Sequence, residues 1–474
     1  MVMGELTQET QLLVIGGGPG GYAAAFRAAD LGLDVTMVDE GSGPGGACLF
    51  RGCIPSKTLL FITELIYDAA RSETMGIAFD RPRLDLERLR SWKGKVVDRL
   101  AGGLVTLSNK RGVQLVQATA EFESSDKVRL QGSEIAHLKF QHAIVATGSR
   151  PITLPGVEMC ESGRIMDSTA ALALAELPET LLVVGGGYVG LELGSVYAAL
   201  GTKVTLADVS ARLLPGMDED LVRPLRRRLE GEFEAMLLNT RVKTMRELPD
   251  HVEVALEGEV EQLDRCFDRV LVAVGRKPNT EGLRLDKTKA KLNERGFVIA
   301  DEQQRTADDR IFAIGDVVGG AMLAHKAMRE GRIAAEVIAG QRSAFDVRAI
   351  PAVVYTDPQL AWCGLSEEQA MREGRRVEVS RFPWTASGRA ATMGVSEGVT
   401  KVVFDPDTGR VLGVGIVGRG AGEMIGEGVL AIEMGALAED MALTMHPHPT
   451  LSETEGEVAE AFLGSPTHLL PTRR

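Results

Sequence analysis

A strand–helix–strand pattern with a glycine-rich turn occurs twice in the chain, and it limits the possible folds more than any other feature. Each copy has an apolar strand, three glycines in the spacing G-x-G-x-x-G, a helical segment, a second strand and an acidic residue. In the first copy these are Leu12–Ile15, Gly16, Gly18, Gly21, an alanine-rich stretch to Gly32, Val35–Val38 and Asp39. Such glycines let the backbone approach a diphosphate, which the free N–H groups of a helix N-terminus can bind. The carboxylate can accept hydrogen bonds from a ribose.

The second copy repeats every part of this pattern. It comprises Leu181–Val184, Gly185, Gly187, Gly190, a helical stretch to Gly201, Lys203–Ala207 and Asp208. One G-x-G-x-x-G is weak evidence, because such turns also occur as simple strand-to-helix connections, but two copies with matching acidic ends predict two Rossmann-like dinucleotide-binding units. A carboxylate such as that of Asp208 accepts from the 2′-OH of NAD and repels the 2′-phosphate of NADP, so the second unit favours NAD.

The chain of 474 residues is longer than one hydrophobic core usually supports, so several domains are expected. A strand ending in glycine follows each unit: His142–Gly148, which contains Thr147, and Val270–Gly275. A third strand, Arg310–Asp316, and an amphipathic helix at His325–Gly340 predict a return to the first domain. From about Ile350 the pattern changes to alternating strands and two helices, centred on Glu367–Glu373 and Glu423–Met434.

These patterns predict an α/β fold with two Rossmann-like domains and a C-terminal α+β domain. The expected boundaries are 1–150 for the first dinucleotide domain, 151–280 for the second, 281–349 for the return to the first, and 350–474 for the C-terminal domain.

The formal net charge of −13 disfavours binding to nucleic acid or to an anionic membrane surface. No stretch reaches the roughly 18 consecutive apolar residues of a membrane helix, and the first residues resemble no signal peptide. We expect a cytoplasmic protein without a metal site, a membrane segment or a nucleic-acid partner.

Two of the five cysteines lie close together, in the segment GGACLFRGCIPSK. In an ideal helix Cys48 and Cys53 would point to different faces, so a disulfide between them needs an interruption, which Gly52 and Pro55 could provide. A strained, accessible disulfide of this kind is labile and suited to catalysis. The residues alone also allow two reduced cysteines that only pack. Cys160, Cys266 and Cys363 are too scattered for a disulfide framework.

These motifs, together with GGGYVGLELG, RIFAIGD, MLAHK, FPWTASGRA and HPHPTLSE, resemble the pyridine nucleotide–disulfide oxidoreductase family from Leu12 to about Leu469. Within that family the chain is most similar to the members that oxidise dihydrolipoamide. The resemblance implies an FAD- and NAD-dependent oxidoreductase whose first unit binds FAD and whose C-terminal domain forms a homodimer. Its partner would be a lipoylated carrier protein or the core of a 2-oxoacid dehydrogenase complex.

The resemblance also implies roles for individual residues. Cys48 would be attacked by substrate, and Cys53 would lie nearest the flavin. Lys57, near the reactive flavin nitrogen, would pair with Glu192. His448 of the other subunit would be the base, oriented by Glu453, while His446 is a weaker candidate. The remaining residues implied to contact FAD are Thr147, Gly148 and Asp316, and those implied to contact NAD are Tyr188 and Gly275. Tyr188 could cover the flavin, or it could simply pack.

The chain departs from the family pattern TCLNVGC at Ala47, Phe50 and Arg51, and Pro447 replaces the usual alanine between the two histidines. One hypothesis is that Arg51 lowers a thiol pKa or attracts an acidic carrier; a solvated arginine is the alternative.

Four alternative functions are weaker. A glutathione-type reductase would want basic residues where Asp208 stands. Mercuric and large thioredoxin reductases need a further redox pair after Cys363, which is the last cysteine. A flavoprotein subunit without turnover would not need the two cysteines and His448.

Overall fold

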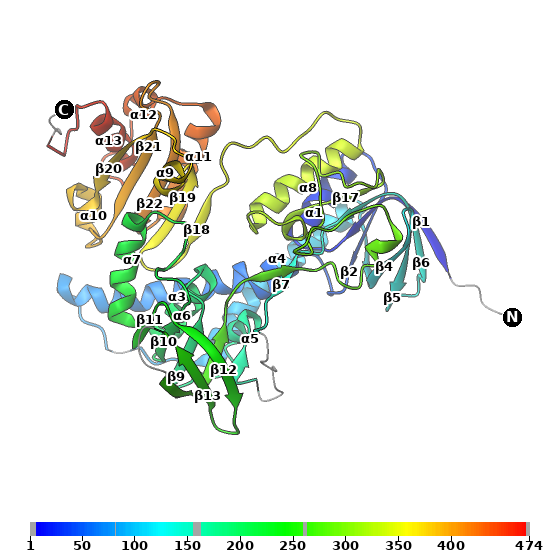
Figure 1. The fold of residues 1–474 in the computed structure, drawn as a ribbon, viewed down its shortest axis with the longest axis horizontal. Coiled ribbons are helices and arrows are strands. Elements are labelled where there is room, and N and C mark those ends of the chain that lie inside the picture. The colour runs from blue at the N-terminus through cyan, green and yellow to red at the C-terminus, as the bar shows by residue number, and fades with distance from the viewer. Residues whose placement is uncertain (1–5, 81, 155–162, 259–262, 471–474) are drawn as a thin grey trace.

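The computed structural model describes residues 6–80, 82–154, 163–258 and 263–470, so Cys160 lies outside the described residues. Its β-sheets form two α/β units and a separate antiparallel unit that contains the C-terminal part of the chain (Figure 1). Among the described residues, no helix is both long and apolar enough to cross a bilayer.

The first unit is built on a sheet with strand order β3-β2-β1-β6-β5-β4. The end of β6 also pairs with β17, along the edge of β6 that faces away from β1. Its strands are β1 (Thr7–Ile15), β2 (Val35–Asp39), β3 (Gln114–Gln117), β4 (Thr119–Ser124), β5 (Lys127–Gln131), β6 (His137–Val145) and β17 (Ile311–Ala313). β1, β2, β3, β6 and β17 are parallel, whereas β4 and β5 extend the sheet antiparallel. Leu12, Leu13 and Val14 are fully buried, as expected where both faces of a parallel strand are covered.

Two helices, α1 (Pro19–Asp30) and α8 (Ala324–Ile338), lie side by side on this unit (Figure 1). Small residues let them approach closely: a Cβ on Gly331 would stand 2.4 Å from the carbonyl oxygen of Gly20. The pairing of β17 with β6 and of α8 with α1 brings residues from after the second unit back onto the first.

The second unit has a parallel sheet of order β11-β10-β9-β15-β8. Its strands are β8 (Ile165–Met166), β9 (Thr180–Val184), β10 (Lys203–Ala207), β11 (Ala235–Leu237) and β15 (Arg269–Val272). Its helices are α5 (Ser168–Ala173), α6 (Tyr188–Ala199) and α7 (Glu219–Glu232), and a three-stranded antiparallel sheet adds β12 (Arg241–Glu247), β13 (Val252–Glu257) and β14 (Leu263–Phe267). A short ribbon of β7 (Ser149–Pro151) and β16 (Arg276–Pro278) joins the two units.

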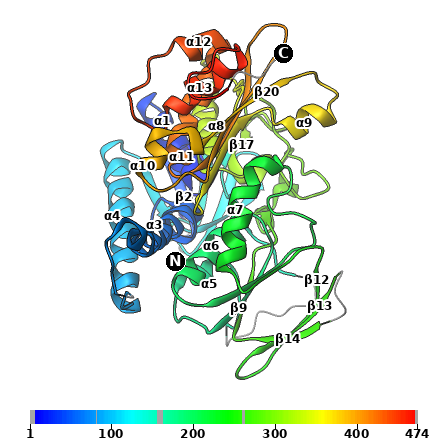
Figure 2. The same cartoon turned by 90° about the vertical axis from the view of Figure 1, so that its left-hand side faces the viewer.

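The cysteine segment forms two helices interrupted at a glycine. α2 (Gly46–Arg51) ends at Gly52, whose φ of −152° and ψ of −110° are not helical, and α3 begins at Cys53. α3 (Cys53–Arg71) continues into a 3₁₀ turn (Ser72–Met75) and packs beside α4 (Leu86–Lys110), as Figure 2 shows. The interruption at Gly52 agrees with the distortion that the sequence predicts.

The third unit has an antiparallel sheet of order β18-β19-β22-β21-β20. Its strands are β18 (Ala352–Val354), β19 (Gln359–Gly364), β20 (Glu378–Pro383), β21 (Val399–Phe404) and β22 (Val411–Gly418). Its helices are α9 (Glu367–Arg372), α10 (Gly388–Thr392), α11 (Ala421–Met434), α12 (Ala438–Leu443) and α13 (Glu453–Phe462). The remaining 3₁₀ turns are Leu285–Lys287, Gly315–Val318 and Trp384–Ala386.

Two sequence expectations need correction. The strands predicted to run to Gly148, Gly275 and Asp316 stop at Val145, Val272 and Ala313, because Gly148, Gly275 and Gly315 have positive φ values of 70°, 131° and 75° that turn the chain out of the sheet. The third unit also contains α10, α12 and α13 besides the two helices expected. α10 and α12 have only five and six residues, and α13 buries charged residues such as Glu455.

Candidate functional site

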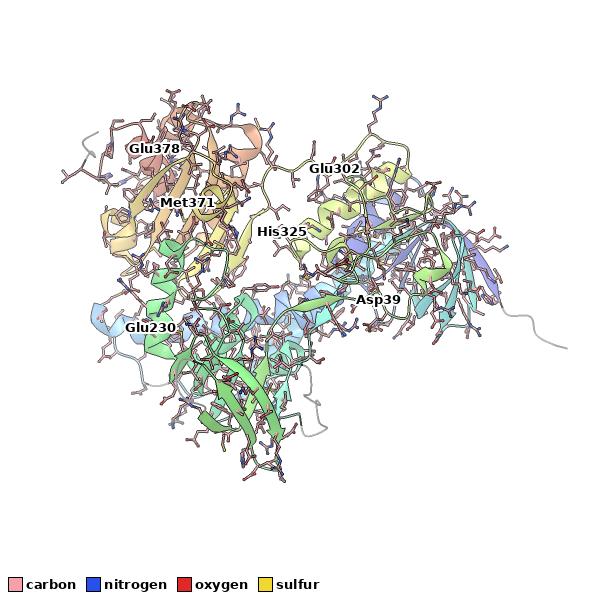
Figure 3. The ribbon with its side chains drawn as sticks, viewed as in Figure 1. Asp39, Glu230, Glu302, His325, Met371 and Glu378 are labelled. Carbon is pink, nitrogen blue, oxygen red and sulfur yellow. The ribbon has the colours of Figure 1, made fainter. Side chains whose placement is uncertain are left out.

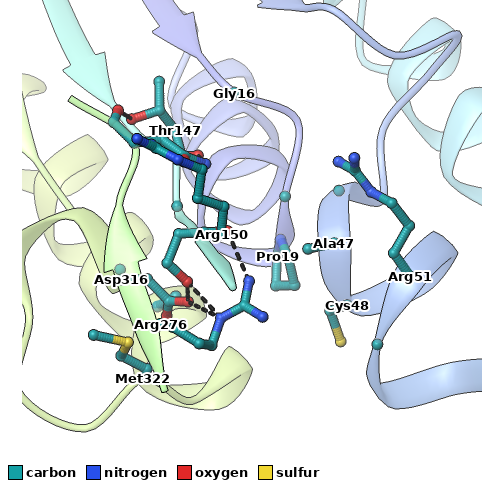
Figure 4. A pocket seen from close by; sticks show the side chains of 18 of the residues that line it. Gly16, Pro19, Ala47, Cys48, Arg51, Thr147, Arg150, Arg276, Asp316 and Met322 are labelled. Carbon is teal, nitrogen blue, oxygen red and sulfur yellow. Dashed lines mark hydrogen bonds and ion pairs between the residues drawn. The ribbon is translucent and has the colours of Figure 1, made fainter. Parts of the chain in front are cut away.

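A cavity of about 610 Å³ lies where the first unit, α2, α3 and the start of α6 meet (Figure 4). Its wall comes from the glycine turn before α1, the loop before α2, the two cysteines, and residues around Thr147 and Asp316. All described residues that line it fall between Ile15 and Ala327, so none comes from the third unit.

The first glycine turn provides a surface that fits a diphosphate. A Cβ on Gly16 would stand 2.3 Å from the carbonyl oxygen of Ala146, and one on Gly21 would stand 1.8 Å from that of Gly16, so both positions need glycine. Gly18, in contrast, faces open space, and no side chain caps the N-terminus of α1. The free N–H groups of this helix are therefore available to an anion in the cavity.

Asp39 stands at the end of β2 in the first unit, where Figure 3 labels it, and lines the same cavity. Its Oδ2 accepts a hydrogen bond from the Gly17 N–H at 2.6 Å, and its Oδ1 accepts from the Gly41 N–H at 2.7 Å. The carboxylate thus fixes the glycine turn. Each oxygen has a second lone pair, which leaves it able to accept from a ribose hydroxyl.

A polar cluster forms the opposite part of the wall, around Asp316. The Ser149 hydroxyl donates to Asp316 Oδ2, and Arg276 donates to the hydroxyl and the carbonyl oxygen of Ser149, both at 2.7 Å (Figure 4). Thr147 and Gly148 line the cavity beside this cluster, and the Thr147 hydroxyl donates to the Asn279 carbonyl at 2.7 Å. The wall combines fixed acceptors and donors suited to a hydroxylated chain.

Both cysteines line the cavity and are present as free thiols. A hydrogen bond from the Cys48 thiol lowers the pKa of Cys53 to about 7; burial opposes this, and the Lys57 ammonium assists it. Hydrogen bonding to Cys53, with burial, raises the pKa of Cys48 above its ordinary value. In the reduced pair the negative charge therefore resides on Cys53.

Lys57 lies one helical turn after Cys53 and forms an ion pair with Glu192 of α6. Its Nζ donates to Glu192 Oε2 at 2.7 Å and to Oε1 at 3.0 Å. Glu192 is buried and also accepts from the Tyr355 N–H at 3.0 Å, while the Lys57 ammonium lies 4.7 Å from the centre of the Tyr355 ring. These contacts hold the cation at the wall of the cavity, next to the thiols.

The second glycine turn repeats the geometry of the first. A Cβ on Gly190 would stand 2.0 Å from the Gly185 carbonyl oxygen, Gly187 faces open space, and α6 has no side-chain cap. Asp208 accepts from the N–H groups of Gly186 and Ser210, as Asp39 does in the first unit.

The three glycines of this turn, Asp208 and Gly275 do not line the first cavity, whereas Tyr188 and Glu192 of α6 do. The helix α6 thus runs from the second turn to the first cavity.

His448 is not brought to the cysteines within one chain. Its side chain is 72% exposed, and its Nδ1 lies 3.2 Å from Glu453 Oε2. It does not line the cavity, in keeping with the expectation that it acts in the site of another subunit. His446 differs: its side chain is only 9% exposed and its Nε2 lies 2.7 Å from Glu427 Oε1, which suits a packing role.

Sequence reasoning missed several residues that arrange the wall. Ser149 and Arg276 hold Asp316, Tyr355 holds Glu192, and Glu330 accepts from the Gly315 N–H at 2.7 Å while pairing with the buried Lys326. Only the MLAHK motif, which includes Lys326, marked one of them. Ser149, Arg276 and Tyr355 meet their partners across long stretches of chain, whereas Glu330 pairs with Lys326 within α8.

Comparison with known proteins gives the same family over nearly the whole chain. The family model described as pyridine nucleotide-disulphide oxidoreductase matches residues 10–331, and the model of its dimerisation domain matches residues 350–459. The dihydrolipoyl dehydrogenase of Vibrio parahaemolyticus is 46% identical over 463 residues, 97% of each chain. That of Geobacillus stearothermophilus is 45% identical and covers 99% of this chain and all of its own.

Solved structures agree in fold. The LpdA protein of Mycobacterium tuberculosis has a TM-score of 0.88 at 26% identity, covering 95% of this chain and 99% of its own. The HOCl-induced flavoprotein disulfide reductase RclA of Escherichia coli has a TM-score of 0.84 at 28% identity, with the same coverage. With two glycine turns, a dithiol at a dinucleotide cavity and these matches, the chain belongs to the pyridine nucleotide-disulphide oxidoreductase family, whose members are flavoprotein oxidoreductases that use FAD and NAD.

Proposed function

We propose that the chain is a dihydrolipoyl dehydrogenase, which reoxidises protein-bound dihydrolipoamide and reduces NAD to NADH. The observation that carries the proposal is the arrangement of Cys48 and Cys53 at the wall of a dinucleotide cavity, with Lys57 held beside them by Glu192. The likeness to dihydrolipoyl dehydrogenases over nearly full length supports the substrate.

In the proposed reaction, the oxidised enzyme carries a Cys48–Cys53 disulfide. A substrate thiolate attacks the Cys48 sulfur and Cys53 leaves as a thiolate; the second substrate thiol then displaces Cys48, closing the substrate disulfide. Two electrons thus pass to the cysteine pair. A pKa of about 7 makes Cys53 a good leaving group, and the Lys57 ammonium stabilises its charge. Bound FAD would supply the redox chemistry that passes this electron pair on to NAD as hydride.

The proposal assigns the two glycine turns to the two cofactors. Gly16, Gly18, Gly21, Asp39, Thr147, Gly148 and Asp316, together with Lys57, would hold FAD, and Gly185, Gly187, Tyr188, Gly190, Asp208 and Gly275 would hold NAD. The proposed domain boundaries are 1–150, 151–280, 281–349 and 350–474, and the segment 281–349 completes the FAD domain. The proposed location of the protein is the cytoplasm.

A homodimer is part of the proposal, because the site needs a base and no histidine is among the described residues that line the cavity. The dimerisation-domain match supports this, and so does an exposed apolar surface on the third unit: Leu430, Met434, Leu443 and Met445 are 61–95% exposed. His448 of the partner subunit would take the proton of the substrate thiol, and Glu453 would orient its imidazole and stabilise the imidazolium.

The first test is the steady-state rate of NADH formation from dihydrolipoamide, with NADP and reduced glutathione as alternative substrates and Cys48→Ser as the inactive control. We expect rapid turnover with dihydrolipoamide and NAD alone. Flavin reduction by NADH without lipoamide turnover would refute the substrate while leaving the redox pair intact. A lower KM for a lipoylated carrier protein than for free dihydrolipoamide would support the carrier or complex core as partner.

Mixing two inactive variants tests the shared site. Cys48→Ser and His448→Gln subunits, unfolded and refolded together, should regain about a quarter of the wild-type sites, because half of the dimers are mixed and each mixed dimer has one intact site. Activity that stays at the level of the separate variants would place His448 and Cys48 in the same chain.

A further inference from the structure

The arginine between the two cysteines faces the cofactor cavity. Arg51 is the last residue of α2, one helical turn after Ala47, and both residues line the cavity. Figure 4 shows that the side chains of Arg51 and Cys48 leave α2 in opposite directions. Arg51 therefore presents its guanidinium away from the Cys48 sulfur.

The other cations of the cavity wall already have partners. Lys57 pairs with Glu192, Arg150 with Glu281 and Asn279, and Arg276 with Ser149. Among the described residues that line the cavity, Arg51 is the lysine or arginine for which no hydrogen bond or ion pair forms within the chain. Its guanidinium is free to bind a ligand.

The carboxylates around the cavity favour a further cation where an anionic ligand binds. Of the five that line it, Glu192 and Glu281 pair with Lys57 and Arg150, and Asp316 lies 4.0 Å from Arg276. Asp39 and Glu40 are the two for which no ion pair forms among the described residues. A dinucleotide adds the negative charges of its diphosphate. The N-terminus of α1 contributes the equivalent of about half a positive charge, which offsets only part of this.

The pKa values of the two thiols are explained by other groups than Arg51. The largest effects of charged groups on the pKa values of Cys48 and Cys53 come from the two thiols themselves, from Lys57 and, for Cys53, from Glu192. The hypothesis that Arg51 lowers a thiol pKa is therefore not supported by this geometry.

We infer that Arg51 binds the diphosphate of FAD, from the α2 side of the cavity opposite the glycine turn of α1. A planar guanidinium donates two parallel hydrogen bonds to phosphate oxygens. Ala47, on the same face of α2, has no polar group that could bind a phosphate. The inference rests on FAD occupying this cavity and is independent of the thiol substrate.

The test measures the dissociation constant of FAD without turnover. Holoenzyme is diluted, and FAD release is followed by the rise in flavin fluorescence, for wild type, Arg51→Gln and Arg51→Lys. The matched control is Arg99→Gln, which removes the same charge from an exposed position on α4 outside the cavity. We expect Arg51→Gln to weaken FAD binding at least about tenfold, since it removes a charge-assisted hydrogen bond, and Arg51→Lys to fall between.

Salt provides a second readout. The FAD dissociation constant of wild type should rise more steeply with salt than that of Arg51→Gln, because one ionic contact to the diphosphate is lost in the variant. Equal affinities for Arg51→Gln and wild type, or an equal loss in Arg99→Gln, would overturn the inference. A change in the pH dependence of Cys53 alkylation in Arg51→Gln would also contradict the inference, because it would show that Arg51 acts on the pKa of a thiol. Failure of the dihydrolipoamide assay would leave this result unaffected.

Discussion

At the residue scale, the dithiol is asymmetric because its two sulfurs have different surroundings. Cys53 receives a hydrogen bond from Cys48 and lies near the Lys57 ammonium, and these lower its pKa to about 7. Cys48 donates that hydrogen bond and has a raised pKa. The reduced pair is therefore about half ionised at pH 7, and the negative charge lies on the sulfur next to Lys57.

Replacing Lys57 tests this arrangement. After reduction, the rate of Cys53 alkylation by iodoacetamide should have its midpoint near pH 7 in wild type, as the pKa requires. Lys57→Met should raise the midpoint by about one pH unit or more, because a stabilising charge is lost. Glu192→Gln should lower it, since the Glu192 carboxylate raises the pKa of Cys53. A shift of both variants in the same direction would contradict this account.

Glu455 is a second residue with a strongly shifted pKa. It is fully buried in α13, neither carboxylate oxygen has a hydrogen-bond partner among the described residues, and burial, with the nearby Glu427, raises its pKa well above the ordinary value. The folded protein therefore keeps the carboxyl protonated at pH values where the unfolded chain ionises. Stability is complete below the unfolded pKa of about 4.3 and falls as the pH rises above it.

Glu455→Met should therefore stabilise the protein by about 1–3 kcal/mol near neutral pH, because a buried polar group without a partner is removed. The gain in thermal midpoint over wild type should grow between about pH 5 and about pH 8. A gain that stays constant over this range would show that Glu455 does not titrate in the way proposed here.

At the scale of elements, the contact of α1 with α8 fixes the first glycine turn. The helices approach so closely that a Cβ on Gly331 would also stand 3.1 Å from the Ala24 backbone nitrogen. These atoms belong to backbone, which cannot move aside without displacing a helix. The end of α1 that faces the cavity depends on this contact.

Gly331→Ala should lower the free energy of unfolding by about 1–3 kcal/mol, as overpacking in a close-packed core does. The matched control is Gly102→Ala in α4, where a new Cβ meets nothing within 4 Å. That change should be neutral or stabilise by up to about 1 kcal/mol through helix propensity. Denaturant unfolding of both variants gives the comparison, and equal effects would refute the role of the contact.

At the scale of the whole molecule, a buried ammonium links the second unit to the third. Lys401 of β21 is 1% exposed and contacts Asp218 at 2.8 Å, Asp220 at 2.9 Å and Glu367 at 2.7 Å. Burial alone would raise the pKa of Asp220, but hydrogen bonds from Arg381 and Lys401 outweigh it and lower the pKa. The three carboxylates are close enough to bind a metal ion, and the Lys401 ammonium takes that place.

Lys401→Met should destabilise the protein by about 3 kcal/mol, because it leaves partly buried carboxylates without their cation. Lys203→Met, which removes an exposed ion pair with Glu179, should cost less than about 1 kcal/mol. Thermal unfolding followed by circular dichroism compares the two. Lys401→Met should also loosen the third unit, seen as faster proteolysis at 339–351; an equal cost for both variants would argue against the link.

Local patterns carried the information on the two α/β units, the helix interruption at Gly52 and the residues of the glycine turns. A glycine turn can be predicted from the sequence because its geometry depends on residues only a few positions apart. Positive φ angles and the absence of a Cβ atom are properties of glycine itself. The C-terminal helices α10, α12 and α13 were not predicted, because short or unusually buried helices show no clear periodic pattern of apolar residues.

The sequence by itself thus determined the fold class, the dithiol and the two dinucleotide turns. Only the tertiary structure decided which distant side chains meet: Tyr355 with Glu192, Arg276 with Ser149, and Lys401 with Asp218. It also decided that Arg51 faces the cavity and that His448 does not. The physical reason is that a side chain's identity sets what it can bind, whereas its partner depends on the packing of helices and strands that are far apart in the chain.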